Sequence, residues 1–184
     1  MLDKSSLKHK IKSLKICVII PTYNNERTLK RVIDGVLEIT GNLIIVNDGA
    51  TDTTPEILKN YTDIPQISLP KNKGKGNALR VGFKKAEELG YDFAITIDSD
   101  GQHYPEDISV FINKLEFETN KNLLRIGARN MDQDSVPGGS SFGNKFSNFW
   151  YKVETGIKLT DTQSGFRLYP LKELNKIKFY NTFL

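Results

Sequence analysis

Short apolar runs alternate along this chain with stretches of helical periodicity, and this alternation constrains the fold more than any other feature. The runs are rich in β-branched residues and lie at 16–20, 43–46, 64–69, 93–97 and 123–128. Runs that are apolar throughout are typical of strands covered on both faces. Strands that alternate with helices favour an α/β fold with a mostly parallel central sheet flanked by helices.

The stretches between these runs predict the helices. Apolar residues recur at helical spacing over 27–38, 77–89 and about 105–119, and Thr54-Pro55 opens a short helix with a favoured N-cap pair. Glycine and serine predict a loop at 136–143, and 145–153 predicts a further amphipathic helix. Because no repeat or linker interrupts the 184 residues, we expect one domain at 15–184 after a basic segment at 1–14.

The basic segment supports two interpretations. Its lysines make it either a solvated, frayed terminus or a polybasic stretch that contacts anionic lipid; they are Lys4, Lys8, Lys10 and Lys12, with Lys15 just after them. The apolar run at 16–20 is too short for a signal peptide, and no run approaches the roughly 18 residues of a membrane span. The net charge of +4 does not call for a nucleic acid partner.

The cysteine content indicates a reducing compartment. Cys17 is the single cysteine of the sequence, so an internal disulfide is excluded. Its place within an apolar run favours a small core residue over a nucleophile. Two scattered histidines, His9 and His103, give no zinc signature.

Polar clusters follow four of the predicted strands. Pro21-Thr22-Tyr23-Asn24 follows the first strand, Asp48 the second, a basic glycine-bearing loop at 71–76 the third, and Asp98-Ser99-Asp100 the fourth. In open α/β sheets, ligands bind in the crevice at the carboxyl ends of the strands. We therefore expect these clusters to share one ligand-binding crevice.

Asp98 and Asp100 predict a divalent metal site. In an extended segment, side chains two residues apart point to the same side, so both carboxylates can face one ion. Mg²⁺ and Mn²⁺ favour carboxylate and phosphate oxygens. Such an ion would stabilise the charge that develops on a diphosphate leaving group. The alternative is an aspartate-rich turn that caps a helix.

The other clusters suit the rest of a nucleotide. Asp48 can accept hydrogen bonds from a base or ribose, or it can be a turn residue before Gly49. The loop at 71–77, which includes Lys75, offers positive charge and backbone N–H groups to an anion, or it is a simple exposed loop. In the polar segment at 161–167, Asp161 can act as a general base, whereas Arg167 can instead be a structural partner for a carboxylate.

The order and spacing of these motifs resemble glycosyltransferase family 2. The resemblance rests on residues 18–24 with Glu26, on 45–52, on 72–78 and on 98–106, and it extends from about 15 to 169. The segment at 161–167 is similar to the branch that contains dolichyl-phosphate mannose synthase and bacterial polyprenyl-phosphate glycosyltransferases. The resemblance implies a GT-A, Rossmann-like fold, inversion at the anomeric carbon and a UDP- or GDP-linked sugar donor.

The resemblance also implies roles for single residues. It assigns Pro21, Tyr23 and Glu26 to the nucleotide pocket and Asp48 to the base or ribose. It makes Asp98 and Asp100 ligands of Mg²⁺ or Mn²⁺ and of the diphosphate, and it adds Gln102 as a third contact. Arg129 matches a position that faces the acceptor phosphate, and Ser141 is a second candidate for that task.

The acceptor determines which chemistry is needed. A polyprenyl phosphate is mostly dianionic at neutral pH, because its second pKa is near ~6, and it needs cations such as Arg129 and Arg125 more than a base. A glycan hydroxyl would instead need a base, for which Asp161 is the leading candidate. The last motif favours the lipid phosphate, and the enzyme is expected in the cytoplasm or peripherally at the inner face of a membrane.

Two further readings stay open. Relatives in this branch continue beyond the motif at 165–167, so we expect the domain to be cut short at the C-terminus, and a non-catalytic nucleotide-sugar-binding remnant is one alternative. A sugar-phosphate nucleotidyltransferase is another, but it should carry a glycine-rich basic loop directly after the first strand, and residues 21–25 contain none.

Overall fold

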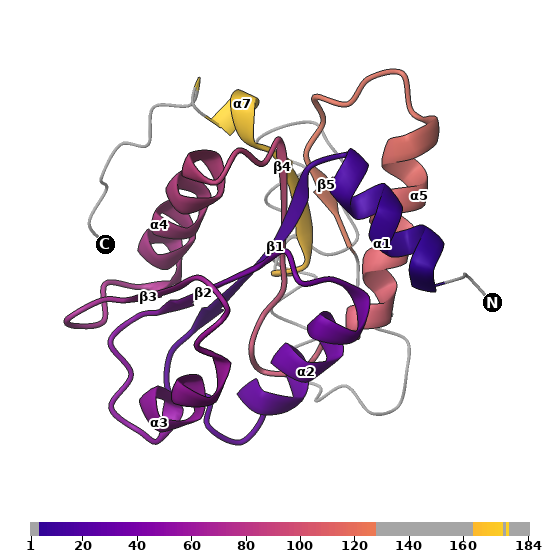
Figure 1. The fold of residues 1–184 in the computed structure, drawn as a ribbon. Coiled ribbons are helices and arrows are strands. Elements are labelled where there is room, and N and C mark those ends of the chain that lie inside the picture. The colour runs from indigo at the N-terminus through magenta and orange to yellow at the C-terminus, as the bar shows by residue number, and fades with distance from the viewer. Residues whose placement is uncertain (1–3, 128–163, 175, 177–184) are drawn as a thin grey trace, which may run out of the picture.

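The sheet of this protein has six strands in the part of the chain that the computed structural model describes, which is residues 4–127, 164–174 and 176 (Figure 1). Their spatial order is β3-β2-β1-β4-β6-β5. β1 pairs in parallel with β2 and β4, β2 pairs in parallel with β3, and β6 is antiparallel to both β4 and β5. The bounds are β1 Ile16–Thr22, β2 Leu43–Asn47, β3 Gln66–Ser68, β4 Phe93–Thr96, β5 Arg125–Ile126 and β6 Arg167–Pro170.

Helices cover both faces of this sheet (Figure 1). One face packs against α1, α2 and α5, and the other packs against α4 and α7. The bounds are α1 Lys4–Ser13, α2 Leu29–Ile39, α3 Thr54–Leu58, η1 Lys59–Tyr61, α4 Lys75–Glu88, η2 Pro105–Asp107, α5 Ile108–Phe117 and α7 Leu171–Leu174. The two η elements are 3-10 helices.

The central strand shows why the apolar runs have no polar alternation. Ile16, Val18 and Ile20 belong to the core under α1, α2 and α5, whereas Cys17 and Ile19 belong to the core under α4. Burial raises the pKa of the Cys17 thiol to about 12, so the reactive thiolate is disfavoured. The interpretation of Cys17 as a core residue agrees with this placement.

Residues 4–13 of the basic N-terminal segment form a helix rather than a frayed terminus. Leu7 and Ile11 of α1, four residues apart, are buried in the core. Lys4 pairs with Glu38 of α2 at 2.9 Å, and Lys10 pairs with Glu116 of α5 at 2.5 Å. Two apolar side chains among so many lysines give a weak helical pattern, which is why the sequence did not reveal α1.

The observed helices and strands differ from those predicted from the sequence in a few places. β6 was not predicted, because its four residues follow a polar segment and alternate between buried and half-buried. β3 covers three residues of the run at 64–69, and β5 covers two of the run at 123–128. The predicted loop at 136–143 and the predicted helix at 145–153 lie outside the described residues.

Candidate active site

A cleft of about 200 Å³ lies at the carboxyl ends of β1, β2 and β4. Six of the site residues predicted from the sequence line it, together with four residues that were not assigned a role. The lining residues are Pro21, Thr22, Tyr23, Asn25, Asp48, Lys75, Ala78, Asp98, Ser99 and Asp100. The polar clusters that follow separate strands therefore share one crevice, as expected for a parallel α/β sheet.

The two aspartates reach the cleft from a turn, not from an extended segment. β4 ends at Thr96, Ser99 and Asp100 lie in a turn, and Gly101 has a φ of 75°. Simple alternation along a strand is therefore the wrong reason for their convergence. The turn is closed by the main-chain N–H of Gln102, which donates to Asp100 Oδ1 at 2.9 Å. Both carboxylates nonetheless line the same cleft.

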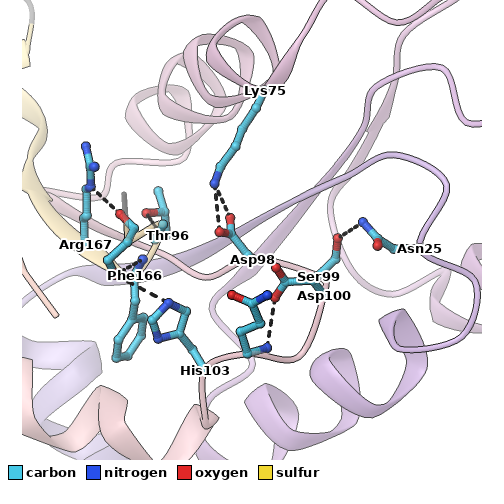
Figure 2. Close-up of polar contacts among 12 residues, drawn as sticks. Asn25, Lys75, Thr96, Asp98, Ser99, Asp100, His103, Phe166 and Arg167 are labelled. Carbon is cyan, nitrogen blue, oxygen red and sulfur yellow. Dashed lines mark hydrogen bonds and ion pairs between the residues drawn. The ribbon is translucent and has the colours of Figure 1, made fainter. Parts of the chain in front are cut away.

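Asp98 is held between a cation and a glycine. Figure 2 shows Lys75 extending from α4 toward Asp98, with its ammonium 2.6 Å from Oδ1 and 2.8 Å from Oδ2. On the other side, a Cβ added to Gly165 would lie 2.0 Å from Asp98 Oδ2. Gly165 is itself fixed by Thr96, whose hydroxyl donates to its carbonyl at 2.7 Å. The segment that begins at Ser164 is therefore in direct contact with the first aspartate.

Asp48 organises the basic loop as well as lining the cleft. It is 2% exposed, and its Oδ1 accepts the main-chain N–H of Lys73 at 3.0 Å. The next residue, Gly49, has a φ of 70°, and a Cβ there would lie 2.4 Å from the Lys71 carbonyl carbon. The loop is thus pressed against the end of β2, so that α4 begins at the cleft with Lys75 as its first residue.

Two predicted donor contacts are not brought to the cleft. Glu26 Oε2 accepts the hydroxyl of Thr53 at 2.7 Å and its N–H at 3.1 Å, and these bonds lower the pKa of Glu26. Its carboxylate therefore serves the start of α3, and Glu26 is not a lining residue. Gln102 is exposed beside the turn and is not a lining residue either.

Three residues beside the aspartate turn were missed by the sequence analysis. The Asn25 amide donates to Ser99 Oγ at 2.8 Å, and the Thr28 hydroxyl donates to the Ser99 carbonyl at 2.6 Å. Arg31 Nη2 lies 3.4 Å from the Gly101 carbonyl oxygen. Their spacing of three residues, which places them on one side of the start of α2, was the available signal.

The far side of the turn contacts the later part of the chain. The His103 ring stacks on Phe166 with centroids 5.2 Å apart, and its Nε2 is 3.4 Å from Ser164 Oγ (Figure 2). The Ser164 hydroxyl donates to the Gly127 carbonyl at 2.5 Å. Arg167 Nε donates to the Ser164 carbonyl at 2.7 Å, so this guanidinium supports the backbone of the segment.

The acceptor side is described in part. Arg129, Ser141 and Asp161 lie outside the described residues. The suggestion that Arg125 clamps the acceptor phosphate is wrong. Its side chain is 9% exposed, and its guanidinium forms an ion pair with Glu118 and donates to the carbonyls of the loop that follows α5.

The carboxylates at the cleft suit Mg²⁺ or Mn²⁺ that is bound jointly by the protein and a substrate, rather than a metal ion bound by protein ligands alone. Within the described ranges, no group of three or more His, Cys, Asp and Glu side chains gathers around a point. Two carboxylates on one wall suit a hard cation that takes its remaining ligands from water and substrate phosphates.

Comparison with known proteins places the chain in a family. The family model described as "Glycosyl transferase family 2" matches residues 17–177. The UDP-N-acetylglucosamine–dolichyl-phosphate N-acetylglucosaminyltransferase of Methanococcus voltae is 32% identical over 191 residues, which cover 91% of this chain and 76% of the relative. The polyprenol monophosphomannose synthase of Mycolicibacterium smegmatis is 27% identical, over 87% of this chain and 63% of the relative.

A solved structure shares the fold. Glucosyl-3-phosphoglycerate synthase from Mycobacterium tuberculosis, crystallised with Mn²⁺, uridine diphosphate and phosphoglyceric acid, matches with a TM-score of 0.67 at 19% identity. The match covers 92% of this chain and 60% of the synthase chain. The chain therefore spans about three-quarters of the first curated relative and three-fifths of this solved structure. No helix in the described ranges is both long and apolar enough to cross a membrane.

Proposed function

Because this chain belongs to glycosyltransferase family 2, we propose that it transfers a sugar from a nucleotide-diphosphate sugar to a polyprenyl, dolichyl-type phosphate. Family membership, the GT-A fold and enzymatic character, all predicted from the sequence, are confirmed by the matches. The observation that carries the donor half of the proposal is the shared cleft of Tyr23, Asp48, Lys75, Asp98 and Asp100.

The donor binds along this cleft in the proposal. Pro21 and Tyr23 flank the base, and Asp48 accepts a hydrogen bond from the base or ribose. The Lys75 ammonium and the N-terminus of α4 face the diphosphate, where positive charge favours an anion. Asp98 and Asp100 hold Mg²⁺ or Mn²⁺, which when bound would neutralise charge on the leaving nucleoside diphosphate.

The acceptor half rests on the relatives and on phosphate chemistry. The name of the Methanococcus relative specifies a dolichyl phosphate, and the name of the Mycolicibacterium relative specifies synthesis of a polyprenol monophosphomannose. A phosphate monoester is already a dianion at neutral pH, so it can attack the anomeric carbon without a general base. In the proposal the attack inverts that carbon, and Arg129 and Ser141 bind the acceptor phosphate.

The same donor site is also compatible with two alternative functions. Transfer to a glycan hydroxyl requires a base, and Asp161 is the candidate. A nucleotide-sugar-binding domain without transfer activity is the second alternative. We keep the lipid phosphate as the proposal, because the names of two compared relatives include a dolichyl phosphate and a polyprenol monophosphomannose.

A peripheral location at the inner face of a membrane is part of the proposal, but α1 gives it little support. α1 ends just before β1 begins, at the amino end of the strand, whereas the cleft lies at its carboxyl end. The seven residues of β1, at about 3.3 Å each, separate the two by roughly 20 Å. Lipid contacted by α1 would therefore lie near the amino end of β1, whereas the cleft lies at its carboxyl end.

A donor panel tests the first half of the proposal. Thermal unfolding is measured with UDP- and GDP-linked sugars, each with and without MnCl₂. A donor at a hundred times its Kd adds about 2.7 kcal/mol of stability, which shifts the Tm by several degrees in a domain of this size. Asp100→Asn should remove the metal-dependent shift, and the exposed Asp63→Asn should keep it. An unchanged shift in Asp100→Asn would discard the metal assignment.

A transfer assay tests the second half. The donor identified by the panel, radiolabelled in its sugar, is offered to a polyprenyl phosphate and separately to a glycan with a free hydroxyl. Lipid-linked label supports the proposal, and label on the glycan supports the hydroxyl alternative. Binding without release of sugar supports the non-catalytic alternative. Arg129→Ala should weaken use of the phosphate acceptor while donor binding is retained.

A further inference from the structure

The aspartate turn is attached to the start of α2 through its middle residue. Ser99 lies between the two cleft aspartates and is 2% exposed. Its side chain accepts the Asn25 amide at 2.8 Å, and its carbonyl accepts the Thr28 hydroxyl at 2.6 Å. Figure 2 shows the side chain of Asn25 directed at Ser99, next to the Asp98 carboxylate that Lys75 contacts. One residue of the turn is therefore held at both its main chain and its side chain.

Thr28 makes this contact in place of an ordinary local one. It occupies the N-cap of α2, where a threonine hydroxyl commonly accepts an N–H of its own helix. Here the side chain makes no capping bond, and its hydroxyl donates across 71 positions of sequence to Ser99. The start of α2 is instead formed by the Asn25 carbonyl, which accepts the N–H groups of Thr28 and Leu29 at 3.2 and 3.0 Å.

We infer that Thr28 is a positioning residue for the metal site, acting through Ser99 on the separation of Asp98 and Asp100. This inference rests on the proposed function, because it assumes that the two carboxylates hold Mg²⁺ or Mn²⁺. Thr28 is not a lining residue of the cleft, so it acts without touching substrate. Removal of a group that orients metal ligands without binding the metal itself typically weakens metal binding by 10- to 100-fold.

The test measures binding of Mn²⁺ alone, from the electron paramagnetic resonance signal of free Mn²⁺ during titration with MnCl₂. Thr28→Val keeps the shape of the side chain and removes the hydroxyl, so we expect at least about tenfold weaker Mn²⁺ binding. Thr28→Ser keeps a hydroxyl and should restore most of the affinity. Unfolding temperatures of all variants are measured in parallel.

Thr40→Val is the matched control. Thr40 lies at the other end of the same helix, is 4% exposed, and its hydroxyl oxygen accepts the Asn42 N–H at 3.1 Å. It should lose thermal stability to a similar degree as Thr28→Val but bind Mn²⁺ like the wild type. A purely structural role for Thr28 would lower the unfolding temperature and leave Mn²⁺ affinity unchanged.

The outcomes separate this inference from the proposed function. If the wild type binds Mn²⁺ and Thr28→Val binds it within twofold of the wild type, the positioning role is overturned and the metal assignment stands. If Thr40→Val loses affinity as strongly as Thr28→Val, the effect comes from destabilised α2, and the positioning role is again overturned. If the wild type itself binds no Mn²⁺, the metal assignment and this inference fall together.

Discussion

Gly165→Ala tests whether the later chain segment sets the position of the first aspartate. The added Cβ would lie 2.0 Å from Asp98 Oδ2 and 2.4 Å from its Cγ, whereas ordinary contact begins at 3.4 Å. The carboxylate must therefore move by more than about 1 Å away from residue 165, which disturbs its ion pair with the Lys75 ammonium. Gly165 does not have a positive φ, so an alanine meets no backbone strain there.

The expected effect on function is much larger than the effect on stability. A displacement of about 1 Å in a reacting group costs roughly 100-fold in rate. The atoms that the new methyl group meets belong to a short side chain that can rotate, so the fold loses about 1–3 kcal/mol at most. For a domain of this size that is a Tm decrease of roughly 2–4 °C per kcal/mol.

The assay compares Mn²⁺ affinity, donor turnover and Tm for the wild type, Gly165→Ala and Gly41→Ala. A Cβ at Gly41 would meet nothing within 4 Å, and Gly41 lies before the amino end of β2, whereas the cleft lies at the carboxyl end of that strand. Gly41→Ala should therefore match the wild type in all three measurements. The reasoning is refuted if Gly165→Ala keeps its fold, its Mn²⁺ affinity and its turnover within about twofold of the wild type.

Two other perturbations follow from contacts near the cleft. Lys75→Met removes the ammonium that contacts both Asp98 oxygens. The Kd for Mn²⁺ alone should therefore fall, while the KM for the donor should rise. A Kd and a KM that both rise, or both fall, would contradict this. Glu26 has a folded-state pKa below its ordinary 4.5 because Thr53 donates two hydrogen bonds to it, so its stabilisation is present above pH 4.5 and lost as pH falls through the folded value. The Tm advantage of the wild type over Glu26→Ala should therefore shrink in acid, and an advantage that is constant with pH would argue against the charge as its source.

The sequence predicted those parts of the fold in which local pattern and burial agree. β1, β2 and β4 are buried on both faces, so their runs are apolar throughout and stand out without any alignment. Their polar ends then predicted the cleft. α1 and β6 lacked such a pattern, because α1 buries two residues of ten and β6 has four residues, of which alternate ones are half-buried.

The contacts that shape the site were harder to predict, because they join residues far apart in the chain. The family resemblance implies a donor contact for Glu26, yet its carboxylate accepts hydrogen bonds from Thr53. Thr28 was given no role, yet it occupies the N-cap of α2 and its hydroxyl donates to the Ser99 carbonyl. Spacing alone does not identify the partner of either side chain, because the partner is the polar group that lies closest once the strands have come together.

The contact of Gly165 with Asp98 has a consequence for the time at which the site becomes complete. During synthesis, the residues that form β1, β2, β4 and α4 leave the ribosome well before Gly165 does, and domains begin to fold as they emerge. Such a nascent chain would already have most of the nucleotide-facing wall, with one neighbour of Asp98 absent. The surroundings of Asp98 are thereby complete only once β6 has been made and has docked beside β4.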